Sequence, residues 1–268
     1  MPLVGRDFMS GIIAWPTRPL NSCRMTAVLA FDTAGERMTV ALASGDRRWS
    51  QSGAGGSQAS AALLPAILGL LDEAGLRLAD LDAIAFGRGP GAFTGLRTAC
   101  SVAQGLAFGA GKPVLPIDSL LVVAEAARRG AAAFRTWAAI DARMNQIYAA
   151  EYRFVDGRWT TLVAPMLFDV VALAERWREA PPEAVAGDAL SAFAGRLDSG
   201  AARRVPEARA DADALLALAL AAWRDGQGVD AAEALPLYVR DKVAQTTRER
   251  QAARAAAAAE TAAETASP

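Results

Sequence analysis

Short apolar segments with strand character alternate with segments of helical periodicity along most of this 268-residue chain. This alternation restricts the fold to the α/β class, because helices in such an order cover a sheet that the flanking strands build. The first three strands are expected to form a meander with turns at Gly35 and Gly45. The predicted strands are 26–31, 37–43, 47–51, 83–86, 113–117, 137–140, 146–154 and 158–163.

The clearest predicted helix covers residues 59–74 and ends before Gly75. Its apolar stripe consists of Ala59, Ala62, Leu63, Ala66, Ile67, Leu70, Leu71 and Ala74, at the spacing of one helix face. Leu64 and Leu68 lie off this stripe and widen the apolar face. Two interpretations stay open: the helix is deeply buried, or it presents a surface to a partner.

A glycine-rich stretch, GRGPGAFTGLR at residues 87–97, follows a predicted strand and leads into a helix over residues 94–108. Its backbone could cradle an anion at the helix N-terminus, or its glycines could serve only a tight turn with close helix packing. The Walker A and dinucleotide-binding motifs do not fit, because no Lys follows Gly95 and the glycine spacing differs. Small residues along the helix favour close packing against neighbouring elements.

The chain contains no histidine, which excludes Ser-His-Asp triads, Cys-His pairs and HExxH zinc sites. A net charge of -1 provides no general attraction to nucleic acid or anionic membranes. The two cysteines, Cys23 and Cys100, are too few for a disulfide scaffold, which favours the reducing cytoplasm. No segment is apolar enough over the length that a membrane span requires.

Other candidate features are weaker. Asp141 follows a predicted strand, where α/β proteins place both ligand-binding groups and helix caps. Arg203 and Arg204, and separately Arg248, Arg250 and Arg254, could contact RNA phosphates, although such charges commonly form solvated surface. Further helices are predicted from residue 118 or 119 to 129 and over 169–178 and 211–224.

Four segments together resemble the bacterial TsaB (YeaZ-like) family of tRNA threonylcarbamoyladenosine biosynthesis proteins. They are LAFDTA (29–34), GRGPGAFTGLR with AQGLA (103–107), IDARMNQIYAAEY (140–152) and PLYVRDKVA (236–244), in that family's order. The resemblance implies the actin-like, sugar-kinase and Hsp70 type of α/β fold (ribonuclease H-like), with two related lobes of which the second is reduced. We therefore expect a non-native or disordered extension at 1–24, a partner-binding first lobe at 25–130, a smaller second lobe at 131–247 and an Ala-rich tail at 248–268.

The resemblance also implies a function. The chain would be a non-catalytic scaffold and activating subunit of the complex that forms N6-threonylcarbamoyladenosine beside the anticodon of tRNAs reading ANN codons. It would pair with the catalytic subunit TsaD and, with it, the ATPase TsaE, meet tRNA through the complex, and form a homodimer in isolation. It would bind no cofactor alone, since ATP and a metal ion are used by the partner subunits. The alternative is an independent nucleotide-dependent phosphotransferase or peptidase of actin-like fold.

The resemblance assigns no catalytic and no metal-binding residue to this chain, and it places the partner interface on the two helices described above. The implied interface residues are Ala59, Leu63, Leu64, Ile67, Leu68, Leu71, Gly95, Thr98, Ala99, Val102 and Ala103. A second set would lie near the joint with the partner and includes the candidates for any nucleotide contact: Asp32, Thr33, Gly89, Pro90, Gly91, Thr94 and Arg97.

Overall fold

The computed structural model describes residues 25–240, and those up to Leu237 belong to one compact unit. The predicted extension at 1–24 and the predicted tail at 248–268 lie outside the described residues. Two five-stranded sheets with helices around them form the unit, as an α/β fold with two lobes requires. None of the helices within residues 25–240 combines the length and apolar character needed to cross a membrane.

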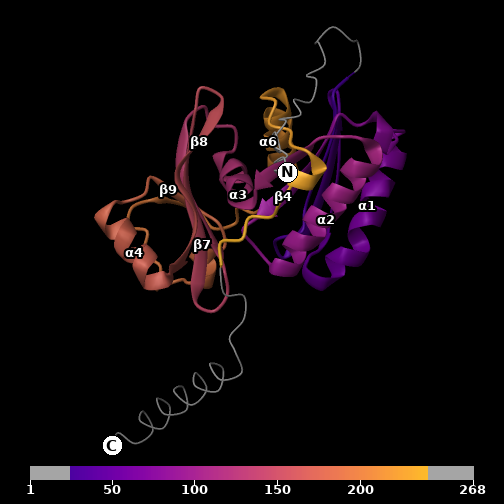
Figure 1. Cartoon of the computed structure of the whole chain (residues 1–268). Helices are drawn as coiled ribbons and strands as arrows, with labels where there is room; N and C mark the ends of the chain where they lie inside the picture. The colour runs from indigo at the N-terminus through magenta and orange to yellow at the C-terminus, as the bar shows by residue number, and fades with distance from the viewer. Residues whose placement is uncertain (1–24, 241–268) are drawn as a thin grey trace, which may run out of the picture. The chain divides into compact units, whose positions relative to one another are not determined.

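The first sheet has the strand order β3-β2-β1-β4-β5. Its first three strands form the predicted antiparallel meander, and β4 and β5 run parallel to β1. The bounds are β1 (Ala27–Asp32), β2 (Arg37–Ser44), β3 (Arg47–Ala54), β4 (Ala83–Gly89) and β5 (Val114–Asp118). Helices α1 (Ala59–Ala74) and α2 (Phe93–Ala110) lie side by side along this sheet (Figure 1).

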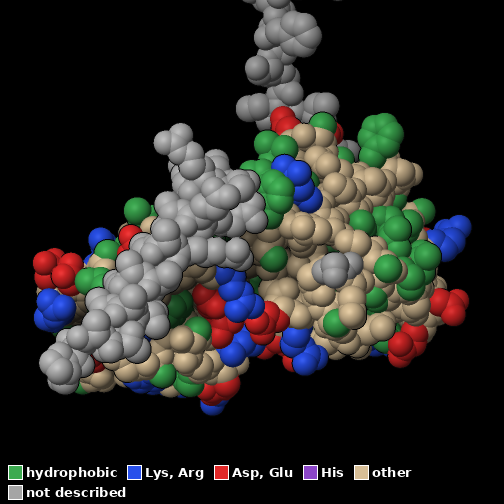
Figure 2. All heavy atoms as spheres, turned by 90° about the horizontal axis from the view of Figure 1, so that it is seen from below, with side chains coloured by type: hydrophobic (Ala, Val, Ile, Leu, Met, Phe, Trp, Pro, Cys, Tyr) green, Lys and Arg blue, Asp and Glu red, His purple; other side chains and the backbone are tan. Residues whose placement is uncertain are grey.

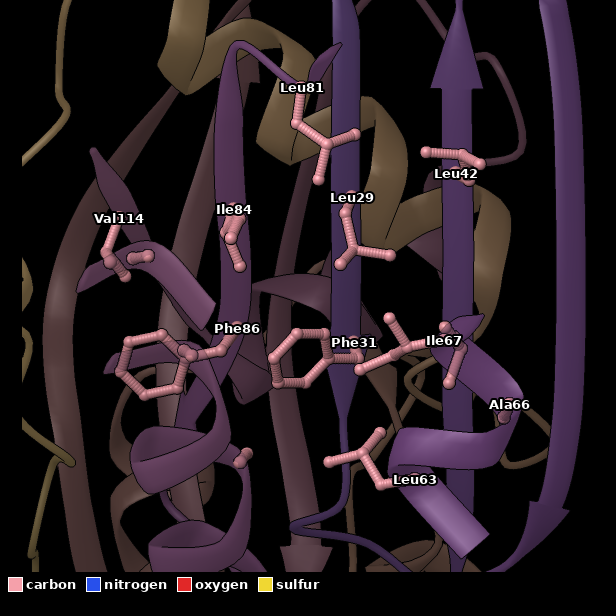
Figure 3. Packing of buried hydrophobic residues seen from close by; sticks show 14 of the residues in the cluster. Leu29, Phe31, Leu42, Leu63, Ala66, Ile67, Leu81, Ile84, Phe86 and Val114 are labelled. Atoms are coloured by element: carbon pink, nitrogen blue, oxygen red, sulfur yellow. The ribbon is translucent and has the colours of Figure 1, made fainter. Parts of the chain in front are cut away.

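Side chains alternate between the two faces of the first sheet along each strand, and in β1 and β2 the residues of both faces are buried. Leu29 and Phe31 of β1 join the core beneath α1 and α2. Figure 3 shows Leu63 and Ile67 of α1 pointing towards Phe31. Val28 and Ala30 face the opposite way and pack with residues of α6 (Ala212–Arg224).

Helix α6 therefore covers the first sheet, although its residues lie within the predicted second lobe at 131–247. An Asp211 carboxylate oxygen accepts a hydrogen bond from the Ala214 N–H at 2.8 Å and caps the helix. Leu215 and Ala219, both fully buried, face the core shared with β1 and β2. An apolar second face on the first sheet needs a covering layer, and the chain returns from the second lobe to supply it.

The second sheet has the order β10-β9-β6-β7-β8. Its strands are β6 (Phe134–Asp141), β7 (Gln146–Val155), β8 (Arg158–Asp169), β9 (Ala184–Ala186) and β10 (Arg203–Val205). Its core is covered by α4 (Val170–Glu179) and the short α5 (Ala189–Ala192). Helix α3 (Ser119–Arg128) contacts both β6 of this sheet and α6 on the first sheet. Trp177 of α4 packs edge-on against Trp137 of β6, with 6.0 Å between ring centroids. Strands β9 and β10 were not predicted.

Replacement of Ile67 by Ala should lower the free energy of unfolding by about 2–5 kcal/mol, because the side chain is fully buried beneath α1 and would leave a cavity. The neighbouring Leu68 is 55% exposed, so Leu68→Ala should change that free energy by no more than about 0.5 kcal/mol. Urea denaturation of both variants measures the difference, and equal losses would contradict the orientation of α1.

Candidate functional site

The outer side of α1 and α2 carries large apolar side chains that no part of the described chain covers. Leu64 and Leu68 of α1 are 43% and 55% exposed, and Phe108 of α2 is 86% exposed. The hydroxyls of Ser60 and Thr98 approach within 3.1 Å and tie the two helices together on this side. We call the residues on this side the outer face: the exposed Ser60, Leu64, Leu68, Ser101, Gly105 and Phe108, and the partly buried Thr98.

Charged residues are sparse on these helices. In α1 they occur at Asp72 and Glu73, both in the last turn, and α2 has one, Arg97. A solvated helix surface normally carries charges along its whole length, whereas partner surfaces are depleted of them. Figure 2 shows hydrophobic side chains gathered on the side of the molecule that carries α1, with charged side chains mainly at its margin.

Two glycines in the second half of α2 leave open space beside the outer face. A Cβ added at Gly105 or Gly109 of α2 would meet no atom within 4 Å, so the chain's own packing does not require glycine there. Glycine within a helix costs roughly 0.5–1 kcal/mol relative to alanine. Together with Leu78 and Ala79 these glycines line a shallow groove at the C-terminal end of α2. A second helix could approach closely here.

The implied interface residues divide into two groups. Leu64 and Leu68 are exposed, and Thr98 and Val102 are partly buried. The others are buried within the protein itself and are not accessible to a partner: Ala59, Leu63, Ile67, Leu71, Gly95, Ala99 and Ala103. The regular apolar stripe therefore faces the sheet, and the interpretation of Leu64 and Leu68 as deeply buried is wrong. The predicted interface did not include Phe108. Its position nine residues after Ala99 places it on the opposite side of the helix from the core, and this spacing could have identified it.

The glycines from the end of β4 to the first turn of α2, together with the loop between these elements, serve contacts within the chain. A Cβ at Gly87 would overlap the Asp32 carboxylate, and one at Gly95 would overlap the Thr33 carbonyl oxygen. At Gly91 a Cβ would stand 2.6 Å from the Ala34 carbonyl oxygen. The loop thus packs directly on the turn between β1 and β2, which agrees with the close-packing interpretation.

Hydrogen bonds hold this contact. The Ala92 N–H donates to the Ala34 carbonyl at 2.8 Å, and the Thr33 hydroxyl donates to the Gly95 carbonyl at 2.7 Å. Thr33 is fully buried. Of the remaining loop residues, Gly89 and Pro90 are buried, Gly91 is partly buried, and Thr94 and Arg97 are exposed.

Asp32 is buried beneath the same loop, with 3% of its surface exposed. One carboxylate oxygen accepts the Ala34 N–H at 2.6 Å and the other accepts the Ser119 hydroxyl at 2.7 Å. Burial raises the pKa of the Asp32 carboxyl, and the hydrogen bonds from Ala34 and Ser119 oppose that rise. The carboxylate oxygens of Asp32 are therefore both engaged by the chain's own groups at the end of β1.

The other candidates stay separate from this surface. Asp141 accepts hydrogen bonds from the backbone and side chain of Arg143 at the turn between β6 and β7. Arg203 and Arg204 are exposed on β10, while the basic residues from Arg248 onwards lie outside the described residues. Within residues 25–240, no group of acidic, Cys or His side chains is arranged to hold a metal ion.

Comparison with known proteins gives consistent matches. The family model of TsaD, tRNA N6-adenosine threonylcarbamoyltransferase, matches residues 56–264. The tRNA threonylcarbamoyladenosine biosynthesis protein TsaB of Escherichia coli is 34% identical over 227 residues, covering 81% of this chain and 96% of the relative. TsaB of Haemophilus influenzae is 44% identical over 124 residues, covering 46% of this chain and 52% of the relative. The solved structure of YeaZ from Pseudomonas aeruginosa is 39% identical, with a TM-score of 0.72, and covers 80% of this chain and 100% of that chain.

Two Gly→Ala substitutions in α2 should change stability in opposite directions. Gly95→Ala forces a methyl group into the Thr33 carbonyl and should lower the free energy of unfolding by about 1–3 kcal/mol. Gly105→Ala meets open space and should raise it by about 0.5–1 kcal/mol. Chemical denaturation of both variants tests this, and a stabilising Gly95→Ala would show that the loop does not pack as described.

Asp32 should make stability depend on pH. Because its pKa is higher in the folded chain, the folded state binds the proton more tightly, and the free energy of unfolding falls as pH rises above about 4 towards the folded pKa. Asp32→Asn cannot ionise and should lose this fall, whereas Asp46→Asn in the exposed turn is the matched control. Denaturation from pH 4 to 8 measures the free energy of unfolding of both variants. If this free energy falls with pH in Asp32→Asn as steeply as in the parent chain, Asp32 is not the cause of the fall.

Proposed function

Because the chain belongs to the TsaB family of tRNA threonylcarbamoyladenosine biosynthesis proteins, we propose that it acts there as a scaffold and activating subunit without catalysis of its own. Its partner in this proposal is the TsaD-type catalytic subunit, and the TsaE-type ATPase joins the pair. The complex would modify the adenosine beside the anticodon of tRNAs that read ANN codons, in the cytoplasm.

The uncovered outer face of α1 and α2 is the observation that carries this proposal. Leu64, Leu68 and Phe108 expose apolar surface of the kind that marks protein–protein contacts. The TsaD family model matches residues 56–264, a range that includes both helices. A TsaD-type subunit would then present a lobe related to this one, and two related lobes can meet through equivalent faces around an approximate two-fold axis.

Two further parts of the proposal concern the chain in isolation. In isolation the outer face would pair with a second copy of the chain, because a self-related face can form an isologous contact. The chain alone would bind no cofactor, leaving ATP and the metal ion to the partner subunits. In support, the carboxylate of Asp32 and the hydroxyl of Thr33 are already hydrogen-bonded within the chain.

Replacement of Leu64 and Leu68 together by Glu should raise the dissociation constant for the TsaD-type subunit by roughly 100-fold, because each substitution places an unpaired charge in an apolar contact. Both side chains are exposed in the chain alone, so the variant should fold normally. Val171→Glu on α4, where Val171 is 64% exposed, is the control and should bind as the parent chain does.

Isothermal calorimetry measures the affinity, and mass spectrometry of tRNA nucleosides from the reconstituted complex measures modification. Modification should fall in parallel with binding. Unchanged affinity of the Leu64→Glu, Leu68→Glu variant would exclude the outer face as the contact. Transferase, kinase or peptidase activity of the purified chain alone would overturn the scaffold proposal in favour of an independent enzyme.

A further inference from the structure

After α6 the chain returns along the first lobe, and residues 226–237 form a segment that we call the strap. It begins at the edge of the first sheet, where Val229 and Val114 exchange two backbone hydrogen bonds of 2.9 Å. The preceding residue, Gly228, passes so close to Pro113 that an added Cβ would lie 2.9 Å from the Pro113 Cβ. The strap thus extends the sheet beyond β5.

The middle of the strap is fastened to α2. The Ala234 carbonyl accepts a hydrogen bond from Gln104 Nε2 at 3.0 Å and another from Cys100 Sγ at 3.1 Å. Ala231 and Ala234 are buried in the same core cluster as Ala99 of α2. Figure 1 shows the strap, in yellow, passing beside α2.

The end of the strap reaches the residues just before α2. The Leu237 N–H donates to the Arg88 carbonyl at 2.7 Å. Next to it, Gly89 has a φ of 105°, and a Cβ there would stand 3.2 Å from the Leu237 carbonyl oxygen and 2.7 Å from Leu96 Cδ2. The strap therefore contacts the sheet edge, the middle of α2 and the loop that leads into α2.

These contacts matter because most of the buried positions on the inner side of α2 are small. Gly95, Ala99, Ala103 and Ala107 interlock weakly with the sheet, whereas Leu96 and Cys100, both in the first half of the helix, are the larger buried residues. Hydrogen bonds are directional, so a pair of them from one flank can fix a helix about its axis. On the other flank Thr98 contacts Ser60 of α1.

We infer that the strap is a positioning device for the docking helix: it sets the rotation of α2 and keeps Ser101, Gly105 and Phe108 facing outward. The positioning residue is Gln104, which acts through Ala234 and need not touch the partner. This inference rests on the proposed function, since it assigns the strap a part in partner binding.

The central test replaces Gln104 by Met, which keeps the length of the side chain and removes the donor. In the isolated chain, hydrogen–deuterium exchange at the Val229 and Leu237 amides and in α2 should become faster. The dissociation constant for the TsaD-type subunit should rise by about 3- to 10-fold, the range expected for one lost hydrogen bond. Gln146→Met, which removes the hydrogen bond from Gln146 to Asp169 in the second lobe, is the matched control and should alter neither readout.

A conservative variant distinguishes the loss of this hydrogen bond from a general loss of stability. In Gln104→Glu the ionised carboxylate cannot donate to the Ala234 carbonyl, whereas the protonated acid can. Binding relative to the parent chain, measured at each pH, should therefore begin to recover as the pH is lowered from 7 towards the ordinary glutamate pKa of about 4.3. The Gln104→Met variant should show no such recovery.

The outcomes separate the inference from the proposed function. Faster exchange, weaker binding and recovery of Gln104→Glu at low pH would support the strap as a positioning device. If Leu64→Glu, Leu68→Glu weakens binding while Gln104→Met leaves binding unchanged, the inference fails and the proposed function stands. If Leu64→Glu, Leu68→Glu binds normally, the outer face is excluded as the contact with the partner, and unchanged exchange in Gln104→Met would refute the strap's hold on α2 as well.

Discussion

The close backbone contact between the glycine loop and the turn after β1 is the constraint on which the rest of the structure depends. Gly91 and Gly95 lie against the backbone of Ala34 and Thr33, and Gly87 leaves room for the Asp32 side chain, so α2 begins close to the end of β1. The same contact buries Asp32 at the end of β1 and Thr33 directly after it. A loop with the composition of an anion cradle thus serves packing within the chain.

Burial and exposure divide the two helices into a side that stabilises the fold and a side available for binding. The inner side supplies the core beneath α1 and α2, where burial of each large aliphatic side chain contributes about 1.5–3 kcal/mol. The outer face, with Leu68 and Phe108 at its surface, contributes little to the stability of the chain alone. A partner lobe on this face, as proposed above, would account for its apolar character and its uncovered glycines.

Local pattern predicted much of the fold. The bounds of α1 agree with the apolar stripe and with the glycine at its end, and the meander agrees with its turn residues. Strands β9 and β10 have three residues each, too few for alternation to be recognised. The position of α6 on the first sheet depends on contacts between distant parts of the chain. The site was harder to predict because Ala and Gly fit either a core or a close interface, so a pattern of small residues does not reveal which side of α2 is inside.

The central claim is that the outer face of α1 and α2 receives a TsaD-type subunit. Hydroxyl-radical footprinting of the chain with and without that subunit tests it most directly, because the method reports the exposure of individual side chains. The account predicts that Leu64, Leu68 and Phe108 lose labelling in the complex while Met166 and Val171, exposed in the second lobe, keep theirs. Equal labelling of Leu64, Leu68 and Phe108 in the free and bound chain would contradict it.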